Sequence, residues 1–409
     1  MTPSRYLNAD DAAARFGDLA QTYAASLMRA DPAADALIEA LHHTSHHGPW
    51  WSMVLAALSD GVESVPEAPA ELRAFVAALP PEPSPQEWEI IEQGGAAVAR
   101  TGDSAGLALQ CAALMIDYWS AAFSKPLELT GNLMQHTAHR LAQTGAWWIE
   151  ALEPGGLRRD RDGFKTTLHV RLIHASVRRM ARPSGVWDTA AWGLPINQGD
   201  LFFRVVGFTW LVLRSLERMG YRISDAEKAA YYRFWRHVAA VLGIDDELLA
   251  LVNEADCLRF WELWFLTNPG PDADTAALAN ASLKALAAMA GGGALTRRAQ
   301  FPILCGATRW LLGEDICDGL KIPRTAWSHV LPLSYRPAVK LSEFVGALMK
   351  QDRSRAVARS IHQLATGNAA VGVMPKGTGV VAEPARLEAL ARFKPVSAAP
   401  EGTAQIRGG

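Results

Sequence analysis

One stretch of the sequence places a histidine and two arginines where they could serve a metal-containing cofactor. His174 lies among valines in a segment of helical periodicity from about 165 to 181. Arg171 precedes it by one helical turn and Arg178 follows it by one turn, so the three share one stripe. An imidazole nitrogen can ligate iron, and arginines bind carboxylates. This stripe therefore has what a haem needs, which is an axial nitrogen, apolar walls and cations for the propionates.

A second stretch, from about 130 to 150, carries Arg140 and Thr144 on one helical stripe. The neighbouring stripe is apolar, which predicts a buried helix. A buried charge without a partner is costly, so Arg140 is either a structural residue that is ion-paired or partly exposed, or a cation that faces an anionic or oxygen-bearing ligand. Both interpretations stay open, as does the one in which His174 is an ordinary core histidine flanked by surface charges.

The elements that must position these residues are helices, because apolar residues recur with helical spacing and alternating strand patterns are absent. We expect an all-α fold, with a single large helical domain over 1–375 and a loosely attached tail over 376–409. Asn197 and Ser224 are expected to cap helices, and Gly220 to end one. Other helices are expected over 11–43, 50–60, 104–123, 246–265, 274–290, 303–312 and near 338–365.

Composition excludes several classes of protein. The 40 Lys and Arg balance 42 Asp and Glu, so nothing indicates a nucleic-acid partner. An apolar fraction of 49% with 14 Trp favours a packed globular protein with a small, apolar ligand. The four cysteines form no CxxC pair, so we expect reduced, buried thiols. The apolar run 201–213, interrupted by Arg204, is shorter than the roughly 20 residues of a membrane span. With no signal sequence visible, a cytoplasmic location is expected.

Two further patterns indicate no chemistry of their own. The histidines between 42 and 47 include pairs four residues apart, but no cysteine or carboxylate completes a local metal site, so a solvated role is expected. Residues 102–106 spell GxSxG, but no strand precedes them as a nucleophile elbow requires. Asp103 or Ser104 is expected to cap the next helix instead.

Several segments, in this order along the chain, resemble the latex clearing protein family of rubber oxygenases and the related helical oxygenase that cleaves a farnesyl chain in mycophenolic acid biosynthesis. The resemblance covers roughly residues 15 to 325. The segments that carry it are Ala-Asp-Pro-Ala-Ala-Asp-Ala-Leu (30–37), Leu-Glu-Leu-Thr-Gly (127–131), Arg-Leu-Ala-Gln-Thr (140–144), Val-Arg-Leu-Ile-His-Ala-Ser-Val-Arg (170–178), Trp-Gly-Leu-Pro-Ile-Asn-Gln-Gly-Asp-Leu (192–201), Arg-Trp-Leu-Leu-Gly (309–313) and Leu-Lys-Ile-Pro (320–323).

The resemblance implies a haem b-dependent oxygenase that uses O₂ on an apolar, unsaturated, isoprenoid-like molecule, with cleavage of a C=C bond to carbonyl products. In this scheme the haem is buried between the helices over 130–150 and 165–181. His174 ligates the iron, and Arg171 and Arg178 hold the propionates. Arg140 and Thr144 are the catalytic residues on the distal side, where Arg140 stabilises charge that develops on bound oxygen.

Two positions depart from the family pattern. Gln143 stands where some members have a lysine, and Ser124 stands near the position of a glutamate proposed as a base in rubber oxygenases. Two alternative functions share much of this pattern. One is a haem-binding sensor or carrier without turnover, and the other is a helical scaffold without a cofactor that acts through partners.

Overall fold

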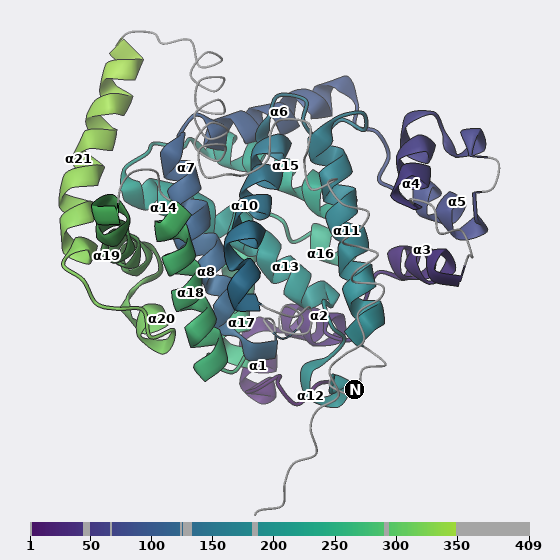
Figure 1. The fold of residues 1–409 in the computed structure, drawn as a ribbon, viewed down its shortest axis with the longest axis horizontal. Helices are drawn as coiled ribbons and strands as arrows, with labels where there is room; N and C mark the ends of the chain where they lie inside the picture. The colour runs from purple at the N-terminus through teal and green to yellow at the C-terminus, as the bar shows by residue number, and fades with distance from the viewer. Residues whose placement is uncertain are drawn as a thin grey trace, which may run out of the picture.

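A computed structural model describes residues 2–43, 50–65, 68–122, 125, 133–181, 187–289 and 294–348. Within these ranges every regular element is helical and none is a strand, which confirms the predicted all-α class. Figure 1 shows α10 (Leu133–Leu152) near the middle of a single helical domain, with α11 (Asp162–Ala181) beside it. The two helices expected to flank a cofactor are therefore neighbours in the fold, and they contact each other directly.

The remaining helices surround this pair. Before α10 lie α1 (Ala9–Phe16), α2 (Asp18–Ser26), α3 (Pro32–His43), α4 (Trp50–Ser59), η1 (Val62–Ser64), α5 (Ala70–Ala77), α6 (Pro85–Ala99), α7 (Asp103–Ala108), η2 (Leu109–Ala113), α8 (Leu114–Ile116) and η3 (Asp117–Trp119). After α11 lie α12 (Thr189–Trp192), α13 (Gln198–Val206), η5 (Gly207–Leu211), α14 (Val212–Met219), α15 (Asp225–Val241), α16 (Asp246–Leu249), α17 (Glu254–Thr267), α18 (Ala273–Met289), α19 (Ala294–Leu312), α20 (Glu314–Gly319) and α21 (Trp327–Leu348).

The predicted helix ends agree with the structure at three places. The Asn197 side chain accepts a hydrogen bond from the Asp200 amide at 2.9 Å and opens α13. Ser224 forms a reciprocal capping box with Glu227 at the start of α15. Gly220 ends α14 with φ of 109°, a left-handed conformation that glycine adopts at little cost.

Four predicted boundaries were wrong. The segment over 11–43, expected as one or two helices, forms three, α1, α2 and α3. The segment expected as one helix over 246–265 is split into α16 and α17. The helices expected to begin at 303 and 338 begin earlier, at Ala294 and Trp327. Pro302 lies inside α19, and two more prolines lie inside α21. These two helices pack against each other, and such packing contributes more to helix stability than local propensity does.

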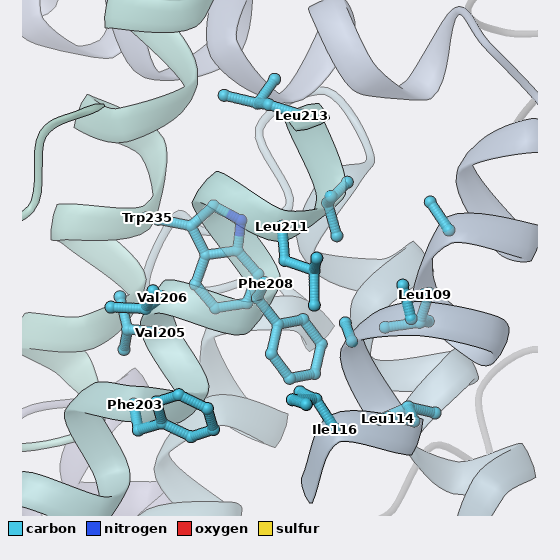
Figure 2. Packing of buried hydrophobic residues seen from close by; sticks show 14 of the residues in the cluster. Leu109, Leu114, Ile116, Phe203, Val205, Val206, Phe208, Leu211, Leu213 and Trp235 are labelled. Carbon is cyan, nitrogen blue, oxygen red and sulfur yellow. The ribbon is translucent and has the colours of Figure 1, made fainter. Parts of the chain in front are cut away.

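Buried side chains form two clusters. The smaller one joins α3, α4 and α5 to one face of α11, where Leu168 and Leu172 are fully buried, and Figure 1 shows these three helices at the edge of the bundle beside α11. The larger cluster fills the rest of the domain. Figure 2 shows its aromatic centre, where Phe208 and Trp235 lie across from Leu109.

Two long helical runs each contain one π turn. The first, η2, lies between α7 and α8, and the second, η5, lies between α13 and α14. The two π turns contact each other in the large core, and Figure 2 shows Leu109 of one facing Leu211 of the other. A π turn has i→i+5 hydrogen bonds and often occurs at a functional site. Here each π turn lies within one to two turns of a buried or half-buried charged side chain, Asp117 after η2 and Arg204 before η5.

A buried ion pair fixes α11 against the start of α3. Arg171 donates from Nε to Asp31 Oδ2 at 2.6 Å and from Nη2 to Asp31 Oδ1 at 2.9 Å, and both residues are about 5% exposed or less. Two turns further along α11, Arg178 donates from Nε to Asp35 Oδ1 at 2.7 Å. Gly243 lies so close that a Cβ there would be 2.4 Å from Asp31 Oδ2. The pair is therefore enclosed by backbone on a side where no side chain fits.

The predicted tail over 376–409 lies outside the residues that the structure describes, and so does the predicted end of the domain at 375. Both stay predictions.

Replacing Gly94 with alanine should destabilise the fold by about 1–3 kcal/mol, because a Cβ there would be 2.2 Å from the carbonyl oxygen of Ala230 in α15. Gly95→Ala is the matched control. A Cβ there would be 3.3 Å from the Phe234 ring, which can shift, and 3.7 Å from the Leu152 carbonyl oxygen, which is ordinary van der Waals contact. Urea unfolding measures both variants. Equal loss of stability in the two would contradict the close approach of α6 and α15.

Replacing Arg171 with alanine should cost about 3–5 kcal/mol of stability, because it leaves the Asp31 carboxylate buried without its cation. Arg179→Ala is the control on the same helix. Its partner Glu39 is exposed, and a surface pair contributes about 0–1 kcal/mol. Chemical denaturation of both proteins checks the difference, and an Arg171→Ala variant as stable as Arg179→Ala would show that the ion pair is not structural.

Candidate functional site

His174 lies on α11 with one ring nitrogen buried and unpaired. Its Nδ1 has no hydrogen-bond partner within the described part of the chain, although the residue as a whole keeps some accessible surface. Desolvation is the main cause that lowers the pKa of His174 to about 3, and the positive charges of Arg204 and Arg178 lower it further. The imidazole is therefore neutral at pH 7, which is the form that ligates a metal.

His169 on the same helix provides a comparison. It is also buried, and desolvation lowers its pKa to about 4. Its ring packs edge-on against the Trp51 ring, with 4.7 Å between the two ring centroids, on the side of the smaller cluster. Two cations act on His174, whereas burial alone shifts His169. The two histidines therefore lie in different surroundings, one polar and one apolar.

The two arginines that flank His174 differ in the hydrogen bonds they have left. Every nitrogen of the Arg171 guanidinium has a partner, because Nη1 faces the Val241 carbonyl at 3.4 Å while Asp31 binds the other two. Arg178 donates from Nε to Asp35 and from Nη1 to the Ile196 carbonyl at 3.2 Å. Its Nη2 is buried without a partner among the described residues. Arg178 thus has one buried terminal nitrogen without any partner among the described residues, whereas each nitrogen of Arg171 has at least one partner.

Arg140 has a partner in the protein, and that partner is a phenol. Its Nη2 donates to the Tyr118 hydroxyl, which in turn lies 2.7 Å from the Ser282 hydroxyl on α18. The Thr144 hydroxyl donates to the Arg140 carbonyl at 3.0 Å, within α10. The Thr144 proton is therefore used inside the helix, while its oxygen can still accept a hydrogen bond.

Two residues that sequence reasoning did not select complete the site. Asp117 is 7% exposed and pairs through Oδ2 with Arg204 Nη1 at 3.3 Å. Desolvation raises the pKa of Asp117, and the charges of Arg204 and Arg140 oppose that shift. Each is the only charged residue in a long apolar run, Asp117 within 104–123 and Arg204 within 201–213. A single charge in such a run was the available signal.

These contacts bring α10, α11, α13 and η3 together around one group of charges. The positive charge of Arg204 lowers the pKa of His174. Arg204 also forms an ion pair with Asp117, and the positive charge of Arg140 lowers the pKa of Asp117. The predicted site residues on the two helices are thus connected, and the link runs through the two residues that were missed. The arrangement offers a neutral ligand nitrogen together with several cationic donors.

Other candidate chemistries find no support within the described residues. No group of three or more His, Cys, Asp or Glu side chains there is placed to hold a metal. The four cysteines are free and buried, as expected, and burial raises the pKa of Cys111 to about 12.

The Ser104 hydroxyl lies 2.9 Å from that of Tyr221 and 2.7 Å from that of Tyr335. Gly102 is the N-cap of α7, so the expected cap at Asp103 or Ser104 was wrong.

Most of the histidine cluster over 42–47 lies outside the residues that the structure describes. Residues 44–49 are outside the described ranges, and so are the side chains of His42 and His43. None of the described helices is both long and apolar enough to cross a membrane.

Comparison with known proteins gives consistent matches. The family described as "ER-bound oxygenase mpaB/B'/Rubber oxygenase, catalytic domain" matches residues 98–343, which is more than half of the chain. The rubber oxygenase of Streptomyces sp. (strain K30) is 26% identical over 217 residues, a match that spans 47% of this chain and 51% of that protein. The match therefore covers about half the length of this curated relative.

The fold matches as well. A solved structure of latex clearing protein LCP in the closed state superposes with a TM-score of 0.65 at 17% identity, over 82% of this chain and 91% of that chain. At this identity the likeness shows the fold alone. The extent of the family match decides membership, and the chain belongs to the family of the ER-bound oxygenase and rubber oxygenase catalytic domains.

Proposed function

We propose that this protein is a haem b-dependent oxygenase that uses O₂ to oxidise an apolar, unsaturated, isoprenoid-like substrate, with cleavage of a C=C bond to carbonyl products. The observation that carries the proposal is the neutral imidazole of His174, which has a buried, unpaired nitrogen beside the cations Arg178 and Arg204. Family membership and the rubber oxygenase relative support the reaction class and the apolar substrate.

The residues at the site fit a haem better than a bare metal ion. A haem iron would need only one nitrogen from the protein, because the porphyrin supplies four nitrogen ligands of its own. His174 offers such a nitrogen, and the described residues contain no group of three or more His, Cys, Asp or Glu side chains that could hold a bare ion. The spare Nη2 of Arg178, one turn away, suits a cofactor carboxylate. The predicted carboxylate role of Arg171 requires it to exchange or share its bonds to Asp31.

Haem, when bound, supplies the activation of O₂. The chain contributes preorganised polar groups in a largely dry interior. The Tyr118 hydroxyl accepts a hydrogen bond from the Arg140 guanidinium, and the negative charge of Asp117 attracts the same cation, so its remaining N–H groups are oriented before any substrate arrives. Thr144 adds an acceptor oxygen on the same helix. The surrounding core of aromatic and aliphatic side chains favours an apolar substrate over water.

The haem-loaded protein should show a Soret band that His174→Ala loses, because the substitution removes the axial nitrogen. His169→Ala is the matched control, since it removes a second buried histidine from the same helix while leaving the charged side of α11 intact. Absorbance per folded protein after reconstitution with haem measures both. A wild-type protein that stays colourless after reconstitution would overturn the proposal, and equal Soret bands in wild type and His174→Ala would remove His174 as the ligand.

Arg140→Ala should keep its haem, and its oxygenase rate should fall about 10²- to 10³-fold, as expected when one preorganised donor is removed. Tyr118→Phe keeps the guanidinium but removes its hydroxyl partner, so a smaller loss is expected. Melting temperature, Soret absorbance and O₂ consumption with a short polyisoprenoid should be measured on the same samples. Full activity in folded, haem-loaded Arg140→Ala would exclude a catalytic role for Arg140. A haem-loaded wild type without O₂ consumption would instead indicate a carrier.

A further inference from the structure

The face of α21 that points away from the domain is apolar. Leu333 is 78% exposed, Leu341 is 63% exposed and Phe344 is 61% exposed. Val330 and Val345, on the same helix, are 42% exposed each. Within the described part of the chain, the exposed large apolar side chains outside α21 lie singly on separate elements. A continuous exposed apolar surface indicates an interaction site, whereas scattered apolar residues do not.

These side chains form one stripe along the helix. Positions 330, 333, 337, 341 and 344 are three or four residues apart, so they lie on the same face, and no charged residue lies among them. The opposite face packs on the domain, where Val339 is buried and the Tyr335 hydroxyl lies 2.7 Å from that of Ser104. Figure 1 shows α21 at the outer edge of the bundle, beside α19. The stripe therefore lies on a convex surface that the described residues leave exposed.

Four cations lie on one side of this stripe. Arg336 and Lys340 lie at its edge on α21. A Cβ at Gly220 would be 3.1 Å from Arg336 Cγ and 3.5 Å from Lys340 Cγ, so both side chains begin against the end of α14. Arg214 and Arg218 lie one turn apart on the exposed side of α14. Desolvation, and then the positive charge of Arg214, lowers the pKa of Arg218. The four side chains form a basic area on α14 and α21.

The carboxylates on these two helices are already paired with other cations. Glu217 on α14 binds Lys228 at 2.6 Å, and Glu343 on α21 binds Arg100 at 3.0 Å. Among the described residues, no carboxylate forms an ion pair with any of the four cations of the basic area. The area therefore carries an excess of positive charge, which an anionic surface would compensate.

A lipid surface fits this combination better than other occupants do. A second copy of the chain would add four more cations along the same interface, and like charges that face one another oppose association. A helical peptide needs a groove, whereas the stripe lies on the convex side of a single helix. An apolar helix face with Lys and Arg beside it is the arrangement that binds the interface of an anionic bilayer. Trp327, which is 37% exposed, begins α21, and Trp is enriched at membrane interfaces.

We propose that α21 docks this protein on an anionic lipid surface, with its apolar stripe at the boundary between headgroups and acyl chains and the basic area against the lipid phosphates. The docking is peripheral and requires no membrane span. It goes beyond the proposed oxygenase function and does not depend on a cofactor. An apolar substrate partitions into lipid, so docking would bring the protein to the phase in which such molecules collect.

Co-sedimentation of the full chain with vesicles tests the proposal. Vesicles of phosphatidylcholine alone are compared with vesicles that also contain phosphatidylglycerol, at low and at high salt. The wild type should bind the anionic vesicles more tightly and lose much of this advantage at high salt. Leu333→Asp/Phe344→Asp should bind them at least about 10-fold more weakly, because two apolar side chains no longer enter the lipid. Leu258→Asp, at an exposed leucine on α17, is the matched control and should bind like the wild type.

A charge variant tests the basic area separately. Arg336→Gln/Lys340→Gln should weaken binding to the anionic vesicles roughly 5-fold for each charge removed, and should leave binding to phosphatidylcholine vesicles unchanged. All the substituted side chains are exposed, so the melting temperatures should stay close to that of the wild type.

Three results would contradict the proposal. Wild-type protein that stays in the supernatant with both kinds of vesicle would overturn it. Equal binding by the wild type and Leu333→Asp/Phe344→Asp would assign lipid binding to another part of the chain. Light scattering on the same samples measures self-association. A wild-type dimer that binds no vesicles, and that Leu333→Asp/Phe344→Asp converts to a monomer, would assign the stripe to a second copy instead.

Discussion

The ion pair between Asp31 and Arg171 sets the position of α11, and the site depends on it. The bond is bidentate and buried, and it holds one side of α11 one turn before His174, while Asp35 holds Arg178 one turn after it. The two aspartates are four residues apart at the start of α3, which matches one helical turn. These two ion pairs, one turn before and one turn after His174, fix both the rotation and the register of the helix. Rotation of α11 by one residue, about 100°, would break both.

These ion pairs explain which part of the site could be predicted from the sequence. Helical periodicity correctly predicted that Arg171, His174 and Arg178 lie on one helix, because that pattern is local. That α10 lies beside this helix was expected from the family resemblance, and the two helices are in contact. Local spacing carries no information on partners, and Asp31 lies 140 residues before Arg171. The flanking arginines could therefore be recognised as cations but not as members of ion pairs.

The two missed residues show a different limit. Asp117 and Arg204 each interrupt an apolar run, and hydrophobic periodicity assigns such a run to the core without explaining its one charge. The charges become intelligible only when the two runs meet, because each is the partner of the other at 3.3 Å. A single charged residue in an otherwise apolar helix therefore indicates a candidate site, because its burial requires a partner on another element.

The π turns have a consequence for the spacing of these charges along the chain. A turn with i→i+5 bonds accommodates one residue more than a regular turn, so each of η2 and η5 acts as an in-helix insertion of a single amino acid. Removing one residue from η2 would restore a regular helix and turn Asp117 and Tyr118 by about 100° about its axis, away from Arg204 and Arg140. The number of residues in this helix therefore determines whether these charged side chains meet, and a one-residue deletion in η2 would separate them without replacing any of them.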